Sequence, residues 1–347
     1  MNLLTVPTKS LLRYTLLFGL VSALVAGLMF IYVIRYLQAP IVAITEPVVF
    51  EVAAGSSLSR IARDLEVAGY LEHPRFFTLL GRWRGVDSSI KTGEYELSIG
   101  ISPEQLLGVL VQGNTRQYRI TLVEGWTFSQ ALAAIRSGER ISHELTGIEP
   151  EQIAMLLGLD ISNPEGMLFP DTYFYDSGTS DLQLLKRAHA RLSEVLSAAW
   201  EERLGALPLS TAYEALILAS IIEKESAFGA ERGHIAGVFV RRLELGMRIQ
   251  SDPTVIYGLG EEYAGNLTRA HLEQLTLYNT YRIPALPPTP IALAGLDSIT
   301  ASMHPLPSEF LYFVAKGNGE HQFSNTLAEH NAAVRLYQSA PAPNQSR

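Results

Sequence analysis

The sequence contains no cysteine among its 347 residues. This absence excludes a disulfide framework, thiol catalysis and a thiolate metal site. Basic residues do not dominate either: 27 lysines and arginines stand against 35 aspartates and glutamates, a formal net charge of −8 at pH 7. Proteins that bind nucleic acid usually carry basic patches, so this balance argues against nucleic acid as a partner. No His, Asp and Glu cluster has metal-ligand spacing, and we predict no metal and no cofactor.

One stretch near the N-terminus has no charge at all. The 21 residues from Tyr14 to Ile34 are uncharged, and Arg13 and Arg35 flank them. At ~1.5 Å per residue a helix of this length spans about 31 Å, the thickness of a bilayer core. A signal peptide would have a shorter apolar run and a small-residue cleavage site, which the following sequence matches poorly. We therefore predict a transmembrane helix over residues 14–37.

The flanking charges predict the orientation of this span. Lys9 and Arg13 lie on its short N-terminal side. By the positive-inside rule, residues 1–13 form a cytoplasmic tail and everything after Leu37 lies outside. The predicted location is the inner (cytoplasmic) membrane, crossed once, with the larger part of the chain periplasmic or otherwise extracytoplasmic.

The sequence after residue 37 has the pattern of an α+β fold. Residues 48–52 and 93–97 alternate like strands, and helices begin near Leu58 and after Ser102. The first strand–turn–helix unit resembles a LysM module, with Gly55, Ser57, Leu58, Ile61 and Ala62 at the positions of its Gly-Asp/Ser-Ser/Thr-Leu and Ile-Ala motifs. We predict a small LysM-like α+β subdomain over residues 46–118. A purely structural domain that spaces the rest of the chain from the membrane is the alternative.

The remainder is predicted to be mainly helical with short strands. Proline- and glycine-rich loops interrupt it, among them Glu165–Tyr173, which has the composition of a shaped loop, and Phe310–Val314 has the pattern of a strand. We predict a catalytic domain over residues 119–338 and a disordered tail over 339–347.

The most informative segment is an apolar helix that ends in two carboxylates. Thr211-Ala-Tyr-Glu214 has the pattern of a capping box at its start, and Glu223-Lys-Glu225 closes it. At about 100° per residue, Glu225 shares a stripe with Leu218, Ile221 and Ile222, whereas Glu223 points roughly opposite. A carboxyl held against aliphatic side chains should have a raised pKa, as a general acid requires. Alternatively, both glutamates pair with Lys224, Arg232 or Arg241.

Five motifs in order make a family resemblance. They are Glu165-Gly-x-x-Phe-Pro-Asp-Thr, Ala219-Ser-Ile-Ile-Glu-Lys-Glu225, Ser251-Asp-Pro-Thr-Val-Ile-Tyr-Gly258, Tyr278-Asn-Thr-Tyr281 and Leu286-Pro-Pro-x-Pro-Ile. Together they resemble the endolytic murein transglycosylase family (MltG/YceG-like), over nearly the whole chain. The resemblance implies that Glu225 is the catalytic acid, in agreement with its helical face. It also implies a lyase that cuts the β-1,4 bond between N-acetylmuramic acid (MurNAc) and N-acetylglucosamine (GlcNAc) in nascent glycan strands. The products would have 1,6-anhydroMurNAc ends.

Several further residues are candidates for contact with a glycan, listed here together: Gln250, Asp252, Thr254, Tyr278, Asn279 and Glu165. For Asp252 and Thr254 the alternatives are orientation of Glu225 or a turn and helix cap; for Tyr278, burial. Glu165 would bind substrate or cap a helix. Glu223 is interpreted as structural, paired with an arginine such as Arg241.

Two other functions stay open from the sequence. A muramidase would use the same acid but deliver water, with a second carboxylate about 5–9 Å away; Asp252, Glu165 and Asp171 are the candidates. A non-catalytic scaffold that binds the cell wall would need only the anchor and the LysM-like unit. The predicted partners are peptidoglycan strands, the membrane through residues 14–37, and the peptidoglycan synthases that make the strands.

Overall fold

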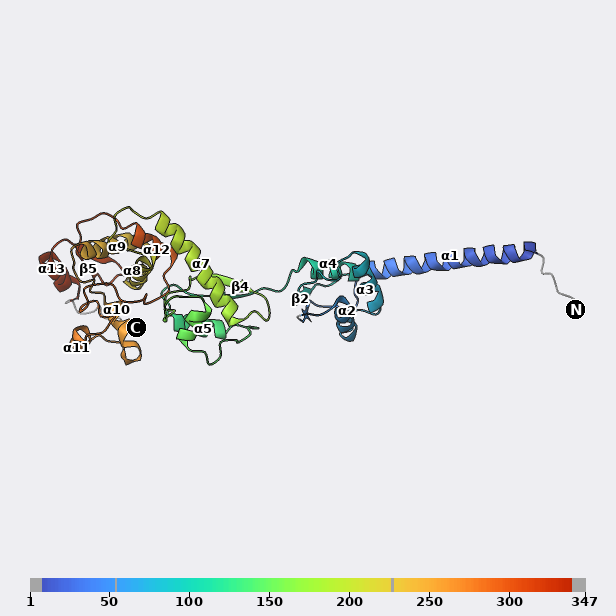
Figure 1. Ribbon diagram of the computed structural model, residues 1–347, viewed down its shortest axis with the longest axis horizontal. Coiled ribbons are helices and arrows are strands. Elements are labelled where there is room, and N and C mark those ends of the chain that lie inside the picture. The colour runs from blue at the N-terminus through green and yellow to red at the C-terminus, as the bar shows by residue number, and fades with distance from the viewer. Residues whose placement is uncertain (1–7, 54, 226–227, 339–347) are drawn as a thin grey trace, which may run out of the picture. The chain divides into compact units, whose positions relative to one another are not determined.

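The computed structural model describes residues 8–53, 55–225 and 228–338. Contacts between Cα atoms divide the chain into two compact units, Met1–Tyr118 and Arg119–Arg347, and both combine helices with short strands (Figure 1). The predicted disordered tail, and the first seven residues of the predicted cytoplasmic segment, lie outside the described residues. The mixed α+β character predicted from the sequence is confirmed.

The first unit begins with a long apolar helix and continues as a small α+β domain. Its elements are α1 (Thr8–Gln38), β1 (Val48–Val52), α2 (Leu58–Val67), α3 (Pro74–Trp83), β2 (Gly93–Leu97) and α4 (Pro103–Gln112). By length and composition, residues Arg13–Gln38 of α1 suffice to cross a membrane. The predicted span of residues 14–37 falls within this helix.

Strands β1 and β2 pair antiparallel, with Phe50 opposite Tyr95, and α2 and α3 lie between them in the chain. The N-cap Ser57 accepts a hydrogen bond from the backbone of Arg60, which explains why α2 starts where it does. Tyr95 and Phe77 are fully buried in the core that these elements share. Both strands have the bounds that the alternating sequence predicted.

The second unit contains most of the helices. Its elements are β3 (Tyr118–Thr121), α5 (Phe128–Arg136), α6 (Pro150–Leu156), β4 (Thr172–Tyr175), α7 (Asp181–Glu201), α8 (Ala212–Glu225), α9 (Gly229–Glu244), α10 (Asp252–Leu259), the 3-10 helix η1 (Gly260–Glu262), α11 (Arg269–Glu273), α12 (Leu296–Met303), β5 (Tyr312–Ala315), β6 (His321–Ser324) and α13 (Leu327–Gln338).

Helix α8 is the centre of this unit. Every residue from Ala215 to Ile222 is buried, because α7, α9, α10 and α12 all pack against it. The predicted capping box is half realised: the Thr211 hydroxyl accepts from the Glu214 backbone, but the Glu214 carboxylate accepts from the backbone of Ser210. The helix ends at Glu225, as predicted, so both carboxylates emerge where the buried helix meets the loops.

The strands of this unit form two-stranded pairs, β3 with β4 and β5 with β6. Part of the segment Glu165–Tyr173, predicted as a loop, is therefore strand, because β4 begins at Thr172 and finds its partner in β3. Strand β5 begins at Tyr312, two residues after the predicted start at Phe310.

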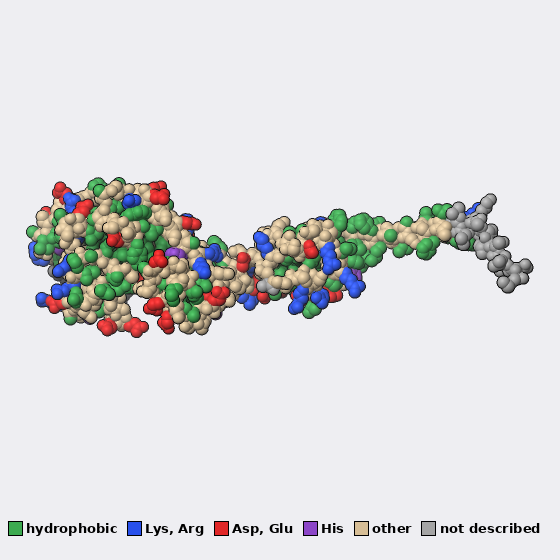
Figure 2. Space-filling view, in the orientation of Figure 1, with side chains coloured by type: hydrophobic (Ala, Val, Ile, Leu, Met, Phe, Trp, Pro, Cys, Tyr) green, Lys and Arg blue, Asp and Glu red, His purple; other side chains and the backbone are tan. Residues whose placement is uncertain are grey.

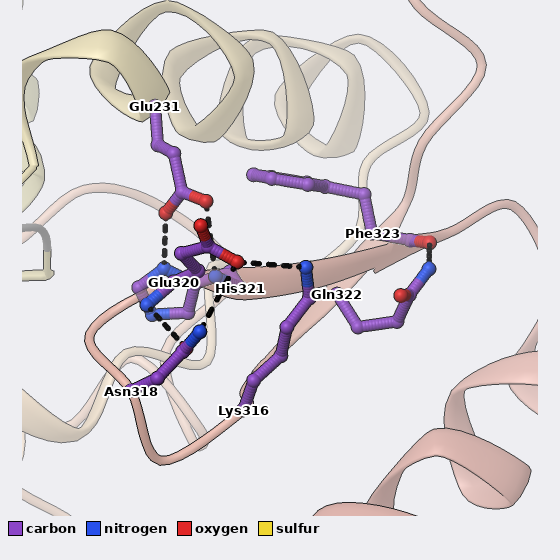
Figure 3. Close-up of polar contacts among 7 residues, drawn as sticks. All are labelled: Glu231, Lys316, Asn318, Glu320, His321, Gln322 and Phe323. Carbon is purple, nitrogen blue, oxygen red and sulfur yellow. Dashed lines mark hydrogen bonds and ion pairs between the residues drawn. The ribbon is translucent and has the colours of Figure 1, made fainter.

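The β5–β6 hairpin is fastened to α9 by one carboxylate. Glu231 accepts a hydrogen bond from the His321 backbone at 3.0 Å and contacts the ring Nδ1 of His321 at 2.8 Å (Figure 3). At the turn, Glu320 is in turn held by Lys316 and Asn318. These contacts fix the hairpin relative to the helix that follows α8.

Candidate active site

Glu225 is the last residue of α8 and lies at the edge of the buried core. Leu218, Ile221 and Ile222, which share its helical stripe, are fully buried, whereas Glu225 itself is partly exposed. Burial against these neighbours raises the pKa of Glu225 to about 7. The raised pKa predicted from the helical stripe is confirmed, and near neutral pH the carboxyl is both protonated and ionised to a similar extent.

Three neighbouring groups shift the pKa of Glu225. The Ser251 hydroxyl donates a hydrogen bond to Glu225 Oε1 at 2.5 Å and lowers its pKa, while the charge of Asp252 raises the pKa and that of Arg242 lowers it. Burial is the largest of these contributions, and the net result is a raised pKa. At neutral pH the protonated and ionised forms of this carboxyl therefore have similar free energies, so it can both donate and accept a proton.

Ser251 and Asp252 stand together at the start of α10. Ser251 is its N-cap and is almost fully buried, while Asp252 is exposed and accepts a hydrogen bond from the Tyr281 hydroxyl at 2.6 Å. Burial raises the pKa of Tyr281 well above its usual value, so its hydroxyl stays protonated and donates. The sequence places these residues in two separate motifs, and the fold brings both motifs to Glu225.

Arg242 holds the loop before α10 in place. Its guanidinium is buried and donates to the carbonyls of Leu311 and Ile249, at 2.7 and 2.6 Å, and to the side chain of Gln250 at 3.3 Å. Gln250 is exposed and has a φ of 57°, in the left-handed region that residues other than glycine seldom adopt. A bent, firmly held loop therefore presents Gln250 next to Ser251.

Thr254 belongs to the support of this loop and does not face a ligand. It is fully buried, donates to the Ser251 carbonyl at 2.7 Å and contacts the Thr280 hydroxyl at 2.8 Å. Thr280 in turn accepts a hydrogen bond from the Ser251 backbone at 3.0 Å. The expected contact between Thr254 and substrate is corrected on this ground: its hydroxyl is used to fix Ser251.

Asn279 is corrected in the same way. It is fully buried, and its amide donates to the carbonyls of His271, Leu272 and Gln274. With its donors committed to three backbone groups, Asn279 ties the loop around α11 together and is not free to bind a sugar.

Tyr278 and Glu165 belong to a second polar group, in which both contact Tyr257. The Tyr278 hydroxyl contacts that of Thr289 at 2.8 Å, and its ring stands edge-on to Tyr257. Tyr257 donates to Glu165, which is buried and also accepts from the backbones of Phe128 and Gly166. Burial raises the pKa of Glu165 despite these donors. Tyr278 is partly buried and Glu165 almost fully so, and the Glu165 carboxylate is occupied by three protein donors.

Glu223 is structural, but its partner is not the predicted Arg241. The guanidinium of Arg232 on α9 donates to Glu223 at 2.9 Å, and both side chains are almost fully buried. The other Glu223 oxygen accepts from the backbone of Gly295. Arg232 also lies 3.6 Å from Glu124 and from Asp297. Arg232 was among the alternatives for a partner; the wrong choice arose because helix spacing alone does not reveal how α9 folds back on α8.

Sequence reasoning did not place Ser251 and Arg242 among the site residues, and it did not predict the Tyr281 hydroxyl as a partner of Asp252. Ser251 was visible as a helix-cap pattern and Tyr281 as one of two tyrosines in a motif, but nothing in the sequence linked either to Glu225. Arg242 had no signal beyond its charge. All three act through contacts between segments far apart in the chain.

The geometry defines a class of site: one partly buried carboxyl that titrates near neutrality, oriented by a serine hydroxyl, beside an exposed second carboxylate. Such an arrangement suits general acid–base chemistry. The model of the YceG-like family matches residues 50–336, and the chain belongs to this family.

Known relatives agree with this membership. The chain is 31% identical over 306 residues to the endolytic murein transglycosylase of Bacillus subtilis (strain 168), covering 83% of this chain and 84% of that protein. It is 28% identical over 314 residues to the endolytic murein transglycosylase of Streptococcus pneumoniae (strain D39), covering 81% of this chain and 56% of the longer relative. A crystal structure of a putative YceG-like protein from Listeria monocytogenes superposes with a TM-score of 0.51 at 30% identity, covering 83% of this chain and 99% of that one.

Proposed function

We propose that this protein is a membrane-anchored endolytic lytic transglycosylase of peptidoglycan, with Glu225 as its single general acid and base. The observation that carries the proposal is the state of the Glu225 carboxyl, whose pKa burial raises to about 7 at the end of a buried helix. The names of the relatives from Bacillus subtilis and Streptococcus pneumoniae support the choice of murein as substrate. The bond to be cut is the β-1,4 link between MurNAc and GlcNAc.

The reaction needs a proton to be given and then taken back. Protonated Glu225 donates to the glycosidic oxygen as the bond from the anomeric carbon of MurNAc breaks. The 2-acetamido group stabilises the positive anomeric carbon, a role that a second carboxylate has in ordinary retaining glycosidases. Ionised Glu225 then accepts the proton of the MurNAc C6 hydroxyl, whose oxygen bonds to the anomeric carbon. A 1,6-anhydro ring forms, no water is consumed, and Glu225 returns to its protonated state.

A pKa near the working pH serves both halves of this cycle. A much lower value would leave too little acid for the first step, and a much higher one too weak a base for the second. Ser251 supports the ionised state through its hydrogen bond, and the Asp252 charge supports the protonated state. We assign Ser251 as a positioning residue, since its hydroxyl fixes one oxygen of Glu225 and leaves the other for the substrate.

Gln250 and Asp252 are the proposed substrate contacts. Both are exposed and flank Ser251, and Gln250 is held in a left-handed backbone conformation that costs roughly 1–3 kcal/mol and is enriched at functional sites. An amide and a carboxylate can pair with the acetamido and hydroxyl groups of a glycan. Tyr278, which is only partly buried, is also proposed as a contact.

The first unit supports anchoring and a LysM-like role. Helix α1 is long and apolar enough for one membrane span, and we propose an N-terminus in the cytoplasm and the catalytic unit on the outer side of the inner membrane. The order β1–α2–α3–β2 with an antiparallel strand pair supports the proposed LysM-like character of residues 46–118. Action on nascent strands would place the protein beside the synthases that make them.

The test is digestion of purified sacculi by the full chain in detergent, with products identified by mass spectrometry. Ends one water lighter than hydrolysed ends would establish the lytic reaction, provided Glu225→Gln releases none. Reducing MurNAc ends would instead indicate a muramidase, with Asp252 as its second carboxylate, since Asp252 is the candidate whose charge acts on Glu225. Retention on sacculi without any product would favour the scaffold.

A further inference from the structure

The end of α1 is packed into the small domain of the first unit. The Tyr36 hydroxyl accepts hydrogen bonds from the backbones of Glu72 and His73, both at 3.1 Å, and the Tyr32 hydroxyl lies 3.0 Å from the His73 ring. The rings of Tyr32 and Tyr36 both pack against Phe76. The start of α3 is thereby fixed to the last turns of α1.

This junction lies at the end of the proposed membrane span. Tyr32 is 18 residues beyond Tyr14, about 27 Å along the helix at ~1.5 Å per residue, against a hydrocarbon core of about 30 Å. His73 and Phe76 are then at the level where the hydrocarbon gives way to lipid headgroups. Tyrosine is enriched at this level in membrane proteins.

Helix α3 turns away from the direction of α1 at this junction. In Figure 1 it crosses the end of α1, with α2 on its far side. Its buried face, formed by Phe77 and Gly81, is directed at α2: a Cβ on Gly81 would clash with the side chain of Leu58. The opposite face of α3 is therefore turned away from the domain core.

That opposite face is amphipathic and exposed, and Arg82 on it donates a long hydrogen bond, 3.5 Å, to the Ser59 hydroxyl of α2. Arg75, Leu79, Arg82 and Trp83 follow one another at spacings of four, three and one, and all four are exposed; Leu79 is 62% and Trp83 81% exposed. No carboxylate within the described residues forms an ion pair with Arg75 or Arg82. A tryptophan this exposed, beside a leucine and two arginines without an ion-pair partner among the described residues, is unusual on a surface that faces only water.

The surroundings are cationic overall. An open groove next to α3 is lined by Arg63, Arg75 and Arg82, with Glu66 and Glu72 as its acidic members. Lys and Arg side chains gather over this unit beside the base of α1 (Figure 2). Basic residues just outside a membrane span attract anionic lipids, and Trp with Leu on a helix lying in the interface inserts among headgroups.

We propose that α3 lies in the membrane–water interface and binds the phosphate-bearing headgroups of the leaflet into which α1 emerges. Trp83 and Leu79 enter the interfacial layer, and Arg75 and Arg82 contact lipid phosphates. The proposal rests on the proposed anchor. Its consequence is that the small domain is held flat on the membrane by two attachments, α1 and α3, so the rest of the chain starts from a defined height above the bilayer.

The absence of cysteine makes a spin-label test direct. Single variants Trp83→Cys and Leu79→Cys are made in the full chain, labelled with a nitroxide and reconstituted into vesicles of phosphatidylethanolamine and phosphatidylglycerol. Accessibility to lipid-soluble oxygen is compared with accessibility to a water-soluble nickel complex. The aqueous control is Glu51→Cys, an exposed site on β1, and the membrane control is Leu24→Cys in α1. We expect the α3 labels to prefer oxygen, between the two controls.

Charge is tested in the same way. Arg75→Gln and Arg82→Gln are each combined with the Trp83→Cys label. Each should lower the ratio of molecules with α3 in the interface to molecules with α3 in water by about fivefold, the factor expected for one basic residue at an anionic surface. Vesicles of phosphatidylcholine alone should lower it further.

Two results overturn the proposal. The first is that the labels at Trp83 and Glu51 have the same accessibility, both typical of water. If the label at Leu24 still reports hydrocarbon in that experiment, the anchor is correct and only the proposal for α3 is wrong. A Trp83 label that responds to soluble chito-oligosaccharide and not to lipid composition would assign the face to glycan. Loss of the Leu24 signal as well would instead defeat the anchor.

Discussion

Ser251 donates a hydrogen bond to Glu225 at 2.5 Å, although 26 residues separate them in the chain. The bond joins the end of α8 to the start of α10. Beside it, the Tyr281 hydroxyl donates a hydrogen bond to Asp252 at 2.6 Å. Ser251 lowers the pKa of Glu225 and the charge of Asp252 raises it, so separate variants of these two residues give distinguishable results.

Replacing Glu225 by Gln should remove the activity and keep the fold. The amide retains the volume and can accept from Ser251, but it cannot donate a proton, and a general acid contributes ~10²- to 10⁴-fold to the rate. Anhydro-ended products released from sacculi measure the loss. Glu244→Gln, the same change at an exposed site on α9, should keep full activity. Wild-type rates from Glu225→Gln would refute the assignment.

Ser251→Ala should move the pH dependence of cleavage upward. Proton donation requires protonated Glu225, so the rate falls as pH rises through about 7. Ser251 lowers the pKa, and without its hydroxyl the pKa rises; a hydrogen bond to a charged group is worth about 1.5–3 kcal/mol, which corresponds to about one to two pH units. The falling limb of kcat/KM against pH measures this.

The control is Ser220→Ala. Its hydroxyl is equally buried in α8 but bonds only the carbonyl of Ile217 and the backbone of Ile291. This variant should lose stability without a shift of the limb. A Ser251→Ala profile that coincides with wild type would mean that the hydrogen bond has no influence on the acid.

Asp252→Asn should move the same limb in the opposite direction. The charge of Asp252 raises the pKa of Glu225, so removing that charge lowers the pKa. The fall in rate with rising pH should therefore begin at a lower pH than in the wild type. Asp252 is exposed and solvent screens its charge, so the shift should be smaller than for Ser251→Ala. Asp160→Asn, an exposed aspartate remote in sequence, is the matched control. Complete loss of activity, together with hydrolysed ends from wild type, would favour the muramidase.

Arg232→Met should destabilise the protein strongly. It leaves Glu223, whose side chain is 5% exposed, without its cation, and a broken buried pair costs about 3–5 kcal/mol. Adding Glu223→Gln to the same chain should restore part of this loss. Arg191→Met breaks the exposed pair with Glu194 and should cost at most about 1 kcal/mol. Thermal unfolding in detergent compares these three variants with the wild type; equal melting temperatures for Arg232→Met and Arg191→Met would contradict the argument.

Local pattern predicted much of the fold. Alternating apolar residues predicted β1 and β2 with correct bounds, and the apolar run with its capping residues predicted α8 and its last residue. These succeed because period and capping act over a few residues. Strand β4 was missed because its pairing with β3 depends on a segment about 50 residues earlier, and no short window contains that partner.

The candidate site divides along the same line. By itself, the sequence determined that Glu225 closes a buried helix with an apolar stripe, and hence that burial raises its pKa, because helical period and hydrophobicity are local properties. Only the tertiary structure decided that Ser251 and Asp252 reach this carboxyl, that Arg232 pairs with Glu223, and that Asn279 and Thr254 are buried. Hydrogen bonds and ion pairs between distant segments depend on how the helices pack, and packing is a property of the whole chain.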